Sequence, residues 1–126
     1  MMRPSQGQGL DSPGVDRTSR PIDLMHLARQ TLGDDGLAGE VLRMFEQQVI
    51  DYFERVRTSS DEFEITLGLH TLKGAAQGVG AMALAEQARA AEAEFAENGA
   101  LDEETLADLE MAVTEVCAYI ASIVRD

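Results

Sequence analysis

The chain has 126 residues, a length that suits one domain with a single hydrophobic core. Its formal net charge of −13 argues against a nucleic-acid binder, which needs basic surface for phosphates, and against attraction to anionic lipid. Because no apolar run could cross a bilayer or serve as a secretory signal, and the single cysteine suits a reducing compartment, we expect a cytoplasmic protein.

The beginning of the chain differs in composition from the rest. Residues 1–20 are rich in Gly, Ser, Pro and Gln and are predicted to form a disordered tail ahead of a single domain at residues 21–126. The next apolar residues recur every three or four positions, as one face of a helix requires. They predict a short helix over about 22–32, ended by Gly33, and a longer one over about 36–57.

A third helix is predicted to begin in the segment "SSDE". Ser59 and Glu62 have the spacing of a capping box there. A regular apolar stripe follows, made of Ile65, Leu69, Leu72, Ala76 and Val79. Gly78 and Gly80 are predicted to end this helix and to make the tight turn into the next one.

Two further helices complete the pattern. One is predicted over about 81–97, and Asp102 is placed to cap the other, whose apolar stripe runs to Ile123. Four amphipathic helices joined by short loops pack best as an antiparallel bundle. The sequence therefore predicts an all-α fold, an antiparallel four-helix bundle with a short additional N-terminal helix.

The segment "LHTLKGAAQGVGA" at residues 69–81 contains the candidate functional residues. Measured from the buried stripe, His70 projects outward by about 120–140° because helical residues advance by about 100° each. Lys73, the only lysine in the chain, follows at the third position and Gly74 at the fourth. Phe63 and Leu67 also point outward and form an apolar surround for the imidazole.

This combination suits phosphoryl chemistry. A neutral imidazole nitrogen is a competent nucleophile toward phosphorus, and a nearby ammonium attracts phosphoryl oxygens. Glycine at position 74 lets another protein approach His70 closely. An isolated surface histidine is usually only a surface residue. The lysine, the glycine and the outward apolar residues together favour the functional interpretation.

The segment resembles the histidine-containing phosphotransfer (Hpt) domains, whose pattern is approximately H-x-L-K-G-[SA]-[SA]-x-x-[LVI]-G-[AL]. The matching residues are His70, Leu72, Lys73, Gly74, Ala75, Ala76, Val79, Gly80 and Ala81. The helix order from Ile22 to about Val124 is also similar to that of the family. The resemblance implies that His70 carries the phosphoryl group, that Lys73 assists it, and that Gly74 gives the partner access.

Two positions leave their roles open. Gln77 departs from the small residue common in the family, and it either hydrogen-bonds the phosphoryl group or crowds it. Glu92 matches a position on the following helix where a polar residue often lies near the histidine. A carboxylate there would repel a phosphoryl group, so its role is not settled by the sequence.

The resemblance implies a phosphorelay intermediate of a two-component system. His70 would accept a phosphoryl group from a receiver-domain aspartyl phosphate and pass it to another receiver. The implied partners are the receiver domains of a hybrid histidine kinase and of a response regulator. The receiver would supply Mg²⁺, so we expect no metal or cofactor on this chain. A complete bundle is expected to be monomeric.

Other functions fit less well. No Walker-type phosphate loop is present, so we expect a phosphoryl carrier without ATP-dependent kinase activity. The segment "GVGAMA" at 78–83 formally fits a dinucleotide-binding fingerprint, but it follows a predicted helix where that motif requires a strand. His26 is expected to be an ordinary helix residue. The remaining alternative is a non-catalytic helical adaptor that docks receivers or other partners.

Overall fold

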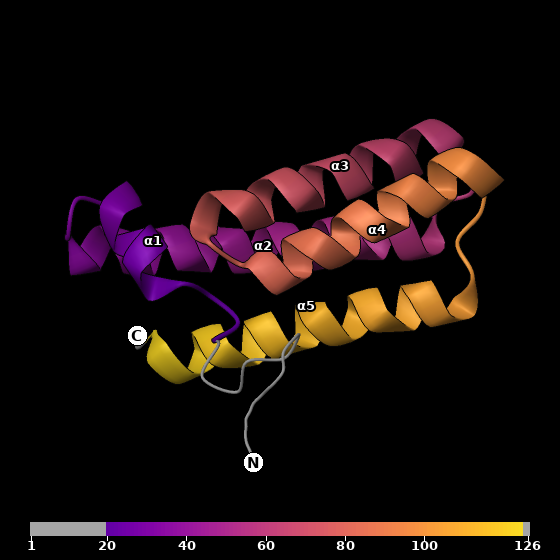
Figure 1. The fold of residues 1–126 in the computed structure, drawn as a ribbon. Coiled ribbons are helices and arrows are strands. Elements are labelled where there is room, and N and C mark those ends of the chain that lie inside the picture. Colours follow the sequence, from indigo (N-terminus) through magenta and orange to yellow (C-terminus); the bar gives the residue numbers. More distant parts are fainter. Residues whose placement is uncertain (1–19, 125–126) are drawn as a thin grey trace, which may run out of the picture.

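A computed structural model describes residues 20–124, which form five α-helices and no strand (Figure 1). The helices are α1 (Leu24–Gln30), α2 (Asp35–Thr58), α3 (Glu62–Val79), α4 (Met82–Asn98) and α5 (Glu103–Ile123). The predicted all-α fold is confirmed. The predicted disordered tail lies, apart from Arg20, outside the described residues.

The four long helices form an antiparallel bundle. Helices α2 and α4 each contact both α3 and α5, whereas α3 and α5 lie on opposite sides of the bundle. The short α1 lies at one end, where it touches α2 and α3 (Figure 1). The largest fully buried side chains come from every long helix and from the segment before α1; they are Ile22, Val49, Leu69, Leu72, Leu84, Leu109 and Ile120. The predicted bundle with an additional N-terminal helix is therefore confirmed.

Aspartates begin four of the five helices. The predicted cap at Asp102 is confirmed, because its carboxylate accepts a hydrogen bond from the backbone N–H of Thr105 at 2.8 Å. Asp23 and Asp34 cap α1 and α2 in the same way. A carboxylate in this position satisfies a free backbone donor and also faces the positive end of the helix dipole.

The predicted capping box at the start of α3 is wrong. Asp61 is the capping residue, and its carboxylate accepts a hydrogen bond from the N–H of Phe63 at 2.9 Å. Ser59 instead ends α2, while its hydroxyl accepts from the N–H of Asp61 at 3.0 Å. Glu62 is the first residue of α3. The charged carboxylate lies nearer the free N–H groups and takes the role that the hydroxyl was expected to fill.

The turn between α3 and α4 depends on one of the two glycines assigned to it. Gly80 has the left-handed φ of 85° that a glycine adopts easily, and the N–H of Ala81 closes the turn on the carbonyl of Ala76 at 2.8 Å. The role predicted for Gly78 is wrong, because it lies inside α3. Its carbonyl lies 3.2 Å from Nε2 of His26, which ties α1 to the end of α3.

The first helix is shorter than predicted. It ends at Gln30, because Leu32 and Gly33 adopt left-handed φ values of 54° and 77° and cannot continue a right-handed helix. Leu32, expected inside the helix, is 92% exposed. Among residues 20–124, no helix is both long and apolar enough to cross a membrane.

Candidate functional site

The outward side of α3 carries a stripe of residues that includes the predicted site. Phe63, Leu67, His70 and Gly74 follow one another at helical spacing, within an arc of about 60°. Phe63 is 72% exposed and Leu67 is 47% exposed, while the side chain of His70 is 66% exposed. The imidazole is therefore open to a partner and has apolar side chains before it along the helix.

Glu92 on α4 joins the predicted histidine and lysine into one cluster. One carboxylate oxygen of Glu92, Oε2, lies 3.2 Å from Nδ1 of His70. The other, Oε1, accepts a hydrogen bond from Nζ of Lys73 at 2.8 Å. The side chains of Lys73 and Glu92 are each 24% exposed, so this ion pair is partly shielded from water. The structure thus brings together His70, Lys73 and Glu92.

The bundle fixes this arrangement through the residues beside His70. Leu69 and Leu72 are 0% and 1% exposed, so α3 cannot rotate about its axis without exposing them. The turn at Gly80 returns α4 antiparallel beside α3. Glu92, which is 22 residues after His70 in the chain, is thereby brought level with it.

The electrostatics of the cluster favour a charged carboxylate. The hydrogen bond from Lys73 lowers the pKa of Glu92 below its usual value, and the contact with His70 lowers it further, against the opposing effect of burial. Glu92 is therefore ionised and its charge is balanced by Lys73. This pairing reduces the repulsion that a bare carboxylate would exert on a phosphoryl group.

The same contact distinguishes the two nitrogens of the His70 ring. A carboxylate is only an acceptor when ionised, so Nδ1 must carry a proton to hydrogen-bond Glu92. In the neutral ring the lone pair then lies on Nε2. Glu92 accordingly favours the tautomer in which Nδ1 carries the proton and Nε2 the lone pair.

A comparison with protein-family models identifies the family of the chain. The model for the Hpt domain matches residues 40–119, which include most of α2, all of α3 and α4, and most of α5. The chain belongs to the Hpt domain family. Membership implies phosphotransfer in a two-component system and interaction with receiver domains. No curated protein and no solved structure matched the chain.

The other predicted residues of the Hpt site lie on the same side of α3. Gly74 is exposed, and a Cβ built on it would meet no atom within 4 Å. Gln77 is also exposed, and its side chain makes no hydrogen bond within residues 20–124. The structure therefore places Gln77 near the site without joining it to His70 or Lys73.

One glycine near the Hpt site was not singled out from the sequence. Gly68 is buried, and a Cβ on it would lie only 2.8 Å from Cγ2 of Val56 on α2. Because Gly68 has no side chain, α2 can approach α3 closely beside the outward stripe that includes His70. The feature of the sequence that could have identified Gly68 as a packing residue was its position next to Leu69, on the edge of the buried apolar stripe.

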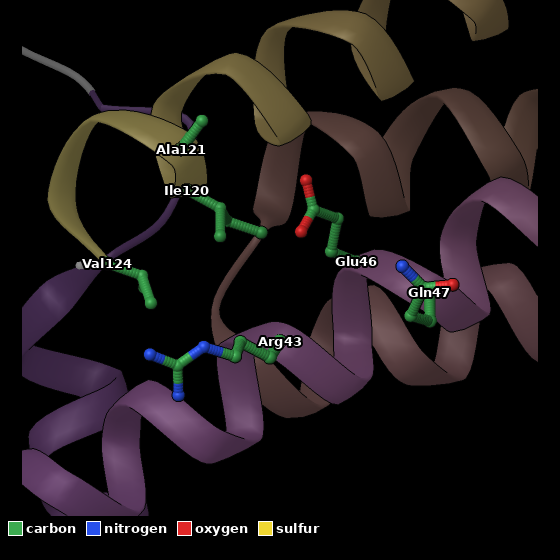
Figure 2. A pocket seen from close by; sticks show the side chains of 6 residues that line it. All are labelled: Arg43, Glu46, Gln47, Ile120, Ala121 and Val124. Carbon is green, nitrogen blue, oxygen red and sulfur yellow. The ribbon is translucent and has the colours of Figure 1, made fainter. Parts of the chain in front are cut away.

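Two further observations concern the surroundings of the Hpt site. A groove between α2 and α5, lined by Arg43, Glu46, Gln47, Ile120, Ala121 and Val124, contains no residue of the His70 cluster (Figure 2). Within the described part of the chain, no group of three or more histidine, cysteine or acidic side chains is arranged to hold a metal ion.

Proposed function

We propose that this Hpt domain accepts a phosphoryl group on Nε2 of His70 from the aspartyl phosphate of one receiver domain and passes it to an aspartate of another. The observation that carries the proposal is the contact between Nδ1 of His70 and Glu92, together with the exposure of the ring. It supports Nε2 as a positioned nucleophile that an approaching receiver can reach.

The transfer balances without a cofactor on this chain. The lone pair of Nε2 forms a bond to phosphorus, while the bond between phosphorus and the aspartate oxygen breaks and the carboxylate leaves. The proton on Nδ1 stays in place, so the phosphorylated ring becomes cationic. Glu92 faces that new charge and stabilises it. Transfer to the next receiver is the reverse reaction.

The other roles in the transfer are shared between this chain and the receiver domain. Lys73 supplies positive charge one turn from His70, where the oxygens of the transferred group will lie. Phe63 and Leu67 contact the receiver, and Gly74 leaves room for it. Mg²⁺ is expected on the receiver. We propose that the chain acts as a monomeric cytoplasmic carrier between a hybrid kinase receiver and a response regulator, without using ATP itself.

Labelling with phosphorylated receiver domains tests the proposal. The wild-type chain should acquire an acid-labile, base-stable phosphate on His70, and His70→Gln should acquire none while keeping its fold. His26→Gln is the matched control, because His26 is the other histidine of the chain and should not affect labelling. Label on the His70→Gln variant would refute the site, and absence of transfer from every receiver would favour a non-catalytic adaptor.

A further inference from the structure

The end of the bundle opposite α1 contains an apolar hollow of about 350 Å³, to which every long helix contributes. Its apolar lining, here called the end hollow, consists of Val56, Ile65, Phe95, Leu101 and Leu106. No helix among residues 20–124 lies across this end, whereas α1 lies against the other end of the bundle (Figure 1). The core is therefore open to a partner at one end.

The end hollow is continuous with the hydrophobic core. Val56 and Phe95 are buried members of that core, at 4% and 8% exposure. Ile65, Leu101 and Leu106 are half-buried and pack against it. A partner that covers these three side chains would remove further apolar surface from water, which favours binding.

The chain segments that meet at this end are strongly acidic. Residues 58–64 carry three carboxylates and residues 94–104 carry five, and neither segment contains a basic side chain. Glu62 itself lines the end hollow. Arg57 is the one basic residue in the lining, and its charge is balanced by Glu54 on the same helix. The rim of the end hollow is therefore negative.

The helix dipoles do not cancel this negative charge. Helices α3 and α5 begin at this end while α2 and α4 finish there, so two positive and two negative dipole ends meet. Asp61 and Asp102 are occupied as caps. Glu62 and Glu103 are exposed, and their side chains interact with no other described side chain. These two carboxylates can pair with a partner.

The negative rim determines which class of partner fits. Nucleic acid and anionic lipid would be repelled, and a second copy of this end would bring like charges together. A protein segment that combines apolar with basic side chains matches both the end hollow and its rim. Amphipathic helices bind apolar grooves in this way.

We propose that the end hollow binds a basic amphipathic helix of a partner protein. An apolar side chain of that helix fills the end hollow, and its lysine or arginine side chains pair with Glu62 and Glu103. The occupant is thus defined by an apolar face and a positive charge.

This surface is separate from the phosphoryl site. Ile65 precedes His70 by five residues, so the two side chains project from α3 about 140° apart. Ile65 faces the end hollow, whereas the imidazole faces outward. A partner at the bundle end therefore leaves His70 accessible, and the proposal does not depend on phosphotransfer.

Two synthetic peptides test the proposal on the full chain. One has leucine at every third or fourth position and lysine between, and the other has alanine in place of each leucine. Isothermal calorimetry should show at least about tenfold tighter binding of the leucine peptide, because only leucine fills the end hollow. Equal affinities would mean that the chain recognises charge alone and would overturn the proposal.

Two charge variants locate the site. Glu62→Lys and Asp35→Lys are matched, because each residue is exposed, begins its helix and follows an aspartate cap. Asp35 lines a second hollow at the α1 end, which Arg43 also lines. We expect Glu62→Lys to weaken binding of the leucine peptide about fivefold or more, and Asp35→Lys to weaken it less than about twofold. Equal effects, or a larger effect of Asp35→Lys, would refute the site.

Two further measurements exclude other occupants and other sites. His70→Gln should bind the leucine peptide as tightly as wild type, and a loss of affinity would place the peptide at the phosphoryl site. In NMR spectra, the peptide should shift the amide signals of Leu101 and Leu106 more than that of Leu37, which lies at the α1 end of α2. Shifts of Leu101 and Leu106 that depend on protein concentration without peptide would assign the end hollow to a second copy. Either of these results would overturn the proposal.

Discussion

The carboxylate of Glu92 accepts a hydrogen bond from Nζ of Lys73 at 2.8 Å, so the only lysine of the chain is joined to α4 beside His70. The other oxygen of the same carboxylate reaches Nδ1 of His70. Glu92 therefore has two effects. It balances the charge of Lys73, and it holds the proton of the neutral His70 ring on Nδ1, which leaves the lone pair on Nε2.

The stability of the Glu92 cluster should depend on pH. Because the pKa of folded Glu92 lies below 4.5, mainly through Lys73, its stabilising effect is fully present above 4.5 and is lost as the pH falls through the folded value. At pH 7, Glu92→Gln should lower the free energy of unfolding by about 1 kcal/mol. The difference from wild type should be smaller at about pH 3 than at pH 7, because protonation of Glu92 starts to remove its stabilising effect below 4.5.

Urea unfolding at the two pH values measures this difference. Glu97→Gln is the control, because Glu97 is exposed on the same helix and makes no interaction with another described side chain. It should change stability by no more than about 0.5 kcal/mol at either pH. A loss for Glu92→Gln that is equally large in acid would show that the ionised carboxylate is not its source.

Lys73 is expected to act on the phosphoryl group through its charge. Removing it leaves the phosphoryl oxygens without this cation and leaves the carboxylate of Glu92 without its lysine partner beside them. Lys73→Ala should therefore slow transfer or shorten the lifetime of phosphohistidine by about tenfold, as loss of a charge-assisted contact implies. Rapid-quench transfer and phosphate-release assays measure both quantities.

Lys73→Arg is the matched variant for this experiment because it keeps the positive charge. It should recover more of the rate and lifetime than Lys73→Ala does. If the alanine variant behaves as wild type, Lys73 is only a structural partner of Glu92.

The sequence predicted those parts of the molecule that depend on local spacing. Apolar residues at intervals of three and four located all five helices, and Asp102 was recognised as a cap from its position before an apolar stripe. The relation of His70, Lys73 and Gly74 could also be read from spacing, because residues three and four apart lie on one side of a helix.

The parts that depend on contacts between helices could not be read in this way. The contact of Glu92 with His70 joins residues 22 positions apart and is set by how α4 lies against α3. A carboxylate considered without Lys73 was expected to repel the phosphoryl group, whereas the structure shows the pair. At the start of α3, two nearby residues could each have served as the cap, and the spacing rule selected Ser59 where Asp61 is the cap.

Gly68 should prove necessary for packing. A Cβ at this position would stand 2.8 Å from Cγ2 of Val56, so α2 or its valine must move. Although alanine favours a helix over glycine, the strain of overpacking is larger, and Gly68→Ala should lower the free energy of unfolding by about 1–3 kcal/mol. Thermal and urea unfolding measure the loss, and the double variant with Val56→Ala should recover part of it. A Gly68→Ala variant as stable as wild type would show that the helices adjust freely.

Gly74, six residues later on α3, should show the opposite behaviour. A Cβ there meets no atom within 4 Å, so Gly74→Ala should raise stability by up to about 1 kcal/mol through helix propensity alone. In Gly74→Gln, a longer side chain stands beside the imidazole, where the receiver must bring its aspartate within bonding reach. This variant should keep or exceed the wild-type melting temperature, yet bind receivers more weakly and exchange phosphoryl groups more slowly. Phosphoramidate, which needs no docking, should still modify His70. Melting temperature and transfer rate measured on the same sample decide the matter, since unfolding of Gly74→Gln, or transfer at the wild-type rate, would contradict a role for this glycine in partner access.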